Sequence, residues 1–269
     1  MKNLKTMLTI LTMYGVSNLS LAQHKHVELH TSDKWSECSF EIDPSLTQEA
    51  WKEFAQEAGL VVYFRPLKDA RPMGAGHFEV ALLQWQTKFD DTKAAWNDTF
   101  VHPDSTHWLK DGDRLPIPGI TARVGITKRL DAGIYFTKNP GANYGFYGGQ
   151  LQYNLVNEEE KNWSASGRMS FISLYGPEDL KLRVYGVDVV VSKEFPIYST
   201  WASVSPYIGI SSYLLSAREI TEKVDLQNEL TADGQGMVGA VIRLASARIG
   251  VEYNLARINT ISFKLGVAF

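Results

Sequence analysis

From residue 76 to residue 269, apolar and polar side chains alternate along the chain with a period of two residues. Successive side chains of a β-strand point to opposite faces, so this pattern predicts strands with one apolar and one polar face. The alternation is clearest near the end, where the apolar positions are Ile261, Phe263, Leu265, Val267 and Phe269. Ten strands are predicted, at 76–88, 117–127, 130–138, 144–155, 163–174, 180–192, 200–214, 236–245, 247–255 and 259–269. The fold class is therefore all-β.

Strands of this kind build either a soluble β-sandwich or barrel, or a barrel that spans a membrane. Most of the predicted strands are long enough to cross a bilayer at a tilt, which takes about 9–11 residues. The two longest connections, 89–116 and 215–235, fall at odd-numbered turns and hence at one end. Membrane barrels sort their loops in this way, whereas sandwiches do not. The sequence thus predicts a transmembrane, antiparallel, up-and-down β-barrel of about ten strands at 76–269. The alternative is a secreted soluble β-barrel or sandwich that binds an apolar ligand and has polar outward faces.

Aromatic residues near the strand ends are expected to form a girdle at each membrane surface. One predicted girdle, at the periplasmic end, contains Trp163, Phe195, Tyr198, Trp201 and Phe269. The other, at the outer end, contains Phe136, Tyr144, Phe146 and Tyr213.

The chain ahead of the strands divides into two parts. Residues 1–22 have a charged start, an apolar run and small residues, which is the pattern of a signal peptide for export. Residues 23–75 are predicted to form a periplasmic N-terminal segment with an amphipathic helix at 45–58, capped by Ser45 and ended by Gly59. This helix would lie at the periplasmic face or plug the barrel. Residues 60–66 would form a strand-like segment, either an edge strand or a segment ahead of the barrel.

Other features of the composition narrow the class further. No apolar stretch of 18 residues follows the signal peptide, which argues against an α-helical membrane protein. Cys38 is the only cysteine, so no disulfide within the chain is expected. The formal charge is only −3 and the basic residues are scattered, which argues against nucleic acid as a partner.

If the apolar faces contact lipid, the opposite faces bring charged side chains into a narrow lumen. Nine such residues are predicted to form a lumen network: Glu79, Arg123, Asp131, Arg168, Asp188, Arg243, Arg248, Glu252 and Lys264. Five are basic and four are acidic. Because buried charges must be paired, this balance predicts a largely filled lumen of ion pairs rather than an open, ion-selective pore.

The last strand resembles the terminal signature of bacterial outer-membrane β-barrel proteins, with Phe263, Leu265, Val267 and Phe269 as the matching residues. The resemblance implies a place in the outer membrane of a Gram-negative-type bacterium, lipid as surroundings, and recognition of these residues by the barrel assembly machinery. The amphipathic segment ahead of the barrel also resembles the N-terminal portion of outer-membrane transporters of hydrophobic compounds, whose barrels are larger.

The expected function is binding or passage of a small molecule, or a structural or surface role, by a monomer with specificity in its external loops. A membrane-embedded lipid hydrolase is a further alternative, because His102, Ser105 and His107 share the first long connection. No nucleophile motif such as G-x-S-x-G accompanies them, so an enzyme is not expected. No cofactor is expected, and no metal either, since His24, His26 and His30 lie on a polar tail.

Overall fold

The structure is a computed structural model that describes residues 42–65, 67–90, 92–97, 99, 114–138, 144–157, 161–198 and 201–269. Three features of the sequence lie outside these ranges: the predicted signal peptide at 1–22, Cys38, and the residues of the hydrolase alternative, His102, Ser105 and His107. The described helices are α2 (Gln48–Val62) and α3 (Ala94–Asn97). The strands are β1 (Phe78–Lys88), β2 (Arg114–Gly125), β3 (Leu130–Lys138), β4 (Gly145–Val156), β5 (Ser164–Tyr175), β6 (Leu180–Ser192), β7 (Phe195–Tyr198), β8 (Ala202–Glu219), β9 (Glu229–Leu244), β10 (Ala247–Leu255) and β11 (Thr260–Ala268).

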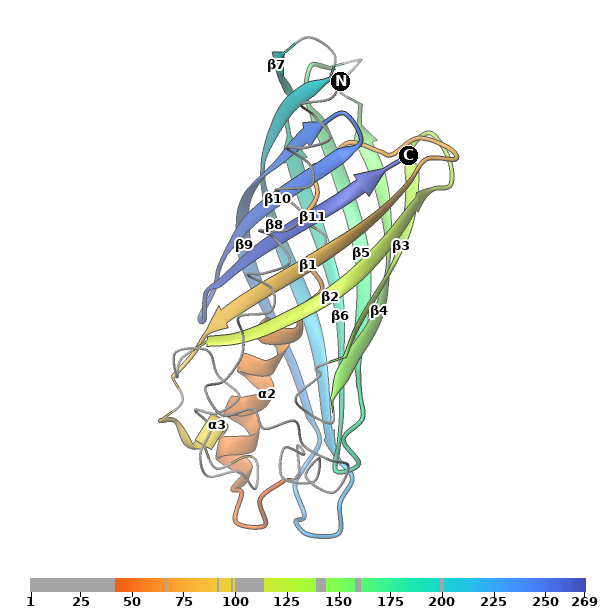
Figure 1. Cartoon of the computed structure of the whole chain (residues 1–269). Coiled ribbons are helices and arrows are strands. Elements are labelled where there is room, and N and C mark those ends of the chain that lie inside the picture. Colours follow the sequence, from red (N-terminus) through yellow and green to blue (C-terminus); the bar gives the residue numbers. More distant parts are fainter. Residues whose placement is uncertain are drawn as a thin grey trace, which may run out of the picture. The chain divides into compact units, whose positions relative to one another are not determined.

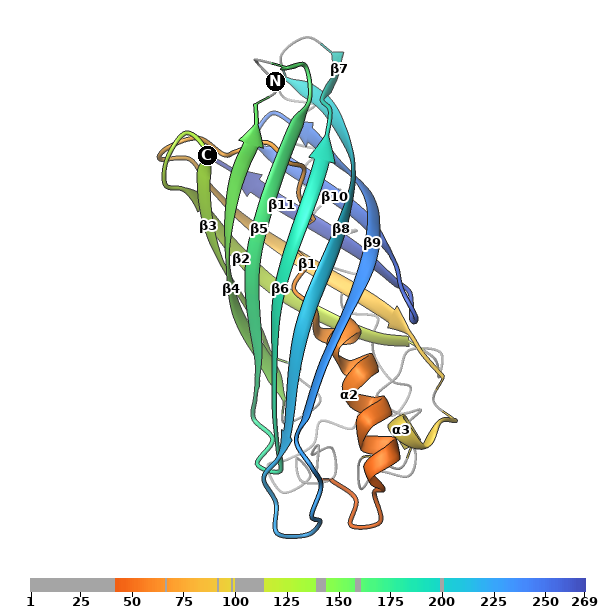
Figure 2. The same ribbon diagram turned by 180° about the vertical axis from the view of Figure 1, so that it is seen from behind.

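Ten of these strands close into an antiparallel barrel (Figures 1 and 2). Each pairs with its neighbours along the chain, β6 pairs directly with β8, and β1 pairs with β11 to complete the ring. The short β7 pairs only with β8, beyond the ring. The predicted fold, an up-and-down barrel of about ten strands preceded by a helix, is confirmed.

The two faces of the strands differ as the alternation predicts. In β6, for example, Val187 is 53% exposed on the outside whereas Asp188 is only 4% exposed inside. Many outward positions on the other barrel strands likewise carry valine, leucine, isoleucine or aromatic side chains. A soluble barrel would need polar outward faces, so this surface contradicts the soluble alternative. Within the described ranges, neither helix is long and apolar enough to cross a membrane.

The barrel has two ends that we name by what lies there. The terminal end carries the start of β1 and the end of β11, where Phe78 and Phe269 exchange backbone hydrogen bonds and stack. The loop end carries the end of β1, the start of β2 and the helices α2 and α3 (Figure 1).

Two predictions about the loop end are wrong. The connection predicted at 215–235 shortens to 220–228, because β8 and β9 extend as a hairpin whose inward residues Leu215 and Ala217 are fully buried. Tyr144, Phe146 and Tyr213, predicted for the outer girdle, point inward instead and are buried. Among the outer-girdle residues, Phe136 faces outward. At the terminal end, Trp163, Phe195, Trp201 and Phe269 are exposed.

The segment ahead of β1 lies inside the barrel. We call residues 42–75 the plug. Helix α2 packs against β8 and β9 at the loop end, and residues 63–75 run through the lumen to the terminal end, where Gly76 donates a hydrogen bond to Gly125. Of the two placements left open for the helix, the structure has the plug. Its apolar face is covered by inward side chains of the wall and by α3.

The bounds of the helix also differ from the prediction. Thr47 caps it, rather than Ser45, and it continues through Gly59 to Val62. Gly59 is needed for close approach and not as a helix end, because a Cβ there would lie 2.5 Å from the Tyr213 ring. Residues predicted as strand-like, Leu60 to Val62, therefore form the last turn of α2.

Candidate functional site

One group of charges that holds the plug comes from β1, β2, β3 and β11. Asp131 accepts hydrogen bonds from the Lys68 ammonium, from Arg123 at 3.2 Å and from the backbone N–H of Met73 at 3.1 Å. Next to it, Lys264 donates to Glu79 at 3.0 Å. All four charged side chains of the wall and Lys68 are buried, so each carries a large desolvation cost that its partners must offset.

A second group of charges fixes the plug near the terminal end. Asp69 accepts from Arg243 at 2.6 Å and from Arg71 at 3.3 Å. Both arginines also donate to Glu194, so two plug residues and two wall residues form a closed ring. Such a ring fixes the register of the plug, because a shift along the lumen would break the two contacts between plug and barrel, Asp69 with Arg243 and Arg71 with Glu194.

A third group lies toward the loop end, where β5 and β6 face the start of the lumen segment. Arg168 pairs with Asp188, which also accepts from the Tyr63 hydroxyl. Arg168 further donates to the backbone carbonyl of Phe64 at 2.9 Å and to Gln150 at 3.1 Å. The wall arginine thus binds the plug backbone directly.

Arg65 is a fully buried cation that joins α2 to β10. Its guanidinium donates to Asn254 at 2.8 Å and to the carbonyls of Leu60 and Tyr63 at 2.5 and 2.9 Å. Asn254 donates in turn to Glu252, which also accepts from Tyr207. Arg65 therefore satisfies the carbonyls that the end of a helix leaves without partners.

The predicted lumen residues are distributed among these groups. Eight of the nine are placed there; Arg248 instead donates to the carbonyls of Ala245 and Ala247 at the terminal end. The sequence reasoning missed the charges of the plug itself, together with Glu194. The missed plug residues are Tyr63, Arg65, Lys68, Asp69 and Arg71. The sequence feature that could have revealed them is the high density of charged residues in 65–71, because a strand-like segment ahead of the barrel would not need so many charges.

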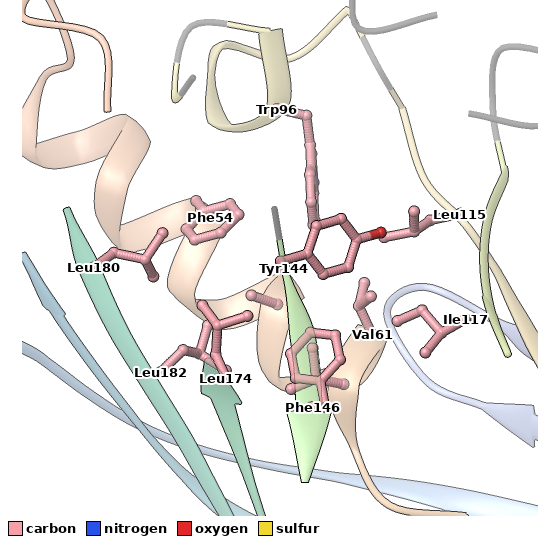
Figure 3. A pocket seen from close by; sticks show the side chains of 12 residues that line it. Phe54, Val61, Trp96, Leu115, Ile117, Tyr144, Phe146, Leu174, Leu180 and Leu182 are labelled. Atoms are coloured by element: carbon pink, nitrogen blue, oxygen red, sulfur yellow. The ribbon is translucent and has the colours of Figure 1, made fainter. Parts of the chain in front are cut away.

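At the loop end an apolar cavity lies between α2 and the wall (Figure 3). Its volume is about 40 Å³, it is partly open, and its lining surface is apolar throughout. In Figure 3 the side chains of β2 lie across the cavity from those of β6, with the helix between them. The lining residues are Phe54, Ala58, Val61, Val62, Trp96, Leu115, Ile117, Tyr144, Phe146, Leu174, Leu180 and Leu182.

Polar contacts outside the cavity hold α2 in place beside it. Glu57, on the buried side of α2, accepts from Lys93 at 2.7 Å and from the indole of Trp96. Hydrogen bonds to Glu57 and then Glu53 raise the pKa of the Lys93 ammonium above its ordinary value. At the start of the helix, Trp51 donates to the carbonyl of Gln227 at 3.1 Å.

The cavity offers an apolar surface. An apolar cavity without polar partners does not hold water well, so it favours an apolar group. Hydrolysis needs a nucleophile beside a base. His102, Ser105 and His107 lie outside the described residues, and His77 is exposed at the terminal end. The residues predicted as an assembly signal, Phe263, Leu265, Val267 and Phe269, point outward from β11 and the residue after it.

Fold and site together define a transmembrane β-barrel whose lumen holds its own N-terminal segment. A closed antiparallel ring of strands with an apolar outer band is the architecture of transmembrane β-barrels.

No family model and no curated protein matches the chain. Solved structures resemble it weakly. The N-terminal β-barrel domain of Pseudomonas aeruginosa OprF is 8% identical over 73% of this chain and 99% of that chain, with a TM-score of 0.29. Yersinia pestis Ail, the attachment invasion locus protein, is 13% identical over 72% and 99%, with a TM-score of 0.26. The β domain of the Bordetella autotransporter BrkA is 10% identical over 73% and 99%, with a TM-score of 0.38. At these scores the likenesses do not bear on the function.

Proposed function

We propose that the protein is a monomeric outer-membrane barrel that binds the apolar part of a small molecule in the cavity at its loop end. The loop end would face outward and the terminal end the periplasm, as in outer-membrane barrels with periplasmic termini. Export by the signal peptide and insertion by the barrel assembly machinery, through the outward residues of the last strand, belong to this proposal. The protein would bind and not catalyse.

The observation that carries the proposal is the contrast between the two parts of the interior. Paired charges lie in the lumen between the plug and the wall, whereas the cavity beside α2 is wholly apolar. A filled, charged lumen disfavours free diffusion of solutes, and a dry cavity next to it favours an alkyl or aromatic group. At about 40 Å³ the cavity suits the end of an alkyl chain rather than a whole molecule.

Binding of a fluorescent fatty acid to the purified full chain in detergent tests the proposal. Ala58→Leu fills the cavity and is expected to weaken binding at least tenfold. Leu182→Ala enlarges the cavity and is expected to retain or strengthen it. Both changes lower the stability of the protein. A loss of stability alone would therefore change the affinities of the two variants in the same direction.

Leu60→Ala is the matched control, since Leu60 is buried on the same helix but does not line the cavity. It should leave the affinity unchanged. Saturable binding that ignores Ala58→Leu would place the ligand elsewhere, and no binding by the unaltered protein would overturn the proposed function.

A further inference from the structure

The outward faces of the described strands carry charge of one sign, and at one end of the barrel. The acidic residues of these strands, among them Glu79, Asp131 and Glu252, occupy lumen-facing positions of the alternation. The outward positions carry six exposed basic residues instead: Lys88, Arg114, Lys138, Lys181, Arg183 and Arg218. Each lies in the part of its strand nearest the loop end. The charge on the lipid-facing side of these strands is therefore purely basic and confined to the loop end.

Three of these cations gather on β6 and β8, which lie side by side (Figure 2). Lys181 is directly opposite Arg218 in the register of the two strands, and Arg183 is the next outward residue of β6. We call Lys181, Arg183 and Arg218 the basic patch. Like charges directly opposite each other on a sheet are destabilising. The barrel therefore gains no stability from this pair, whereas an anion bound between the two side chains would make their arrangement favourable.

The carboxylates near the basic patch do not supply that anion. The turn before β6 and the loop after β8 both belong to the described part of the chain. In them Asp179 pairs with Lys223 at 3.4 Å, and Glu219, at the end of β8, accepts from a backbone N–H of the following loop. Glu178 and Glu222 are exposed, and no carboxylate of the described residues forms an ion pair with the patch.

An apolar surface adjoins the basic patch on the side of the terminal end. Arg183 is opposite Ser216, and the next outward residues are Tyr185 on β6 and Leu214 on β8. These two are opposite each other in the register and are 49% and 41% exposed. The patch thus lies where the apolar outer band ends, which is the level of the lipid headgroups. Long basic side chains at this level can cover apolar surface with their stems while their charged ends reach the headgroups.

We propose that the basic patch binds the phosphorylated headgroup of a membrane lipid, whose acyl chains lie along the apolar surface of β6 and β8. Arginine binds phosphate oxygens through parallel hydrogen bonds, and lysine adds a further positive charge. Three cations favour a headgroup with more than one phosphate. With the loop end facing outward, this lipid belongs to the outer leaflet. The patch lies on the outer wall, so this inference goes beyond ligand binding in the cavity and does not depend on it.

Native mass spectrometry of the purified full chain in a neutral detergent tests the inference. Diphosphoryl lipid A is the probe, because its headgroup carries phosphates, and phosphatidylcholine, which has no net charge, is the comparison. The unaltered protein is expected to bind lipid A about tenfold more tightly or better, because charge-assisted hydrogen bonds are the strong ones. Ala58→Leu, which fills the cavity, should leave this difference intact.

The decisive variant is Lys181→Gln/Arg218→Gln, which neutralises the facing pair and is expected to weaken lipid A binding by about tenfold or more. The matched control is Lys88→Gln/Arg114→Gln, because these two cations are also directly opposite each other at the loop end, on β1 and β2. It should change the affinity by less than about threefold, the effect of a general charge. Lys181→Arg/Arg218→Lys keeps both charges and should bind as the unaltered protein does. Heat-modifiable migration on gels checks that each variant is folded.

Equal loss of affinity in the two neutralised variants would show attraction by net charge instead of a site, and would overturn the inference. Unchanged lipid A binding by Lys181→Gln/Arg218→Gln, or equal binding of lipid A and phosphatidylcholine by the unaltered protein, would overturn it as well. Fatty-acid binding in the cavity is a separate readout. Its failure with lipid A binding intact would remove the proposed function and leave the basic patch standing.

Discussion

At the scale of single residues, Arg65 shows how a cation is kept inside this barrel. Its planar guanidinium donates at once to a wall amide and to carbonyls at the end of α2, which an ammonium could not do. We expect Arg65→Lys to lower the free energy of unfolding by about 2 kcal/mol, the cost of unmade bonds to a buried charge. Urea unfolding of the protein in lipid vesicles measures it. Arg218→Lys, on an exposed residue, is the control. Equal stability of the two variants would contradict this role of Arg65.

At the scale of elements, the alternation of β10 separates lipid-facing from lumen-facing positions. Val251, at the middle of the strand, is 42% exposed, whereas its neighbour Glu252 is 2% exposed. Val251→Arg is expected to cost about 2–4 kcal/mol, because it places a charge at the middle of the bilayer. Glu252→Gln should cost less, since glutamine can still accept from Tyr207. The folding equilibrium in vesicles, titrated with urea, compares them, and equal tolerance would mean that the inside and outside of the barrel are reversed.

The same contrast between elements explains what the sequence could predict. Period two is a local property, so the strands and the inward residues, such as Asp188 and Lys264, follow from the pattern. The course of the plug does not follow from the pattern. Gly59, for example, has the sequence signature of a helix end, and its role in close packing is seen only when the Tyr213 ring is placed beside it. The cavity was not predicted either, because it depends on which side chains of α2, β2 and β6 meet at the loop end.

At the scale of the whole molecule, the barrel and plug depend on each other through opposite charges. The barrel wall alone would place Arg123, Asp131, Glu79 and Lys264 in a common interior, and Lys68 inserts a further cation between the two carboxylates. The plug is therefore fixed by pairs that are buried, and breaking one partner of a buried pair costs about 3–5 kcal/mol. Closure of the lumen should accordingly be sensitive to a single reversal of charge.

Lys68→Glu makes that reversal. It brings a third carboxylate next to Asp131 and Glu79, so we expect the plug to loosen while the barrel stays closed as a ring of strands. In planar lipid bilayers the unaltered protein should carry no steady open-pore current, whereas the variant should show conductance steps and faster proteolysis within 63–75. Heat-modifiable migration on gels checks that the barrel is folded. Lys52→Glu, the same change at an exposed position of α2, is the control and should remain closed. A folded Lys68→Glu barrel that neither conducts nor is cleaved would mean that the plug is held by its remaining contacts, above all the ring formed by Asp69, Arg71, Glu194 and Arg243.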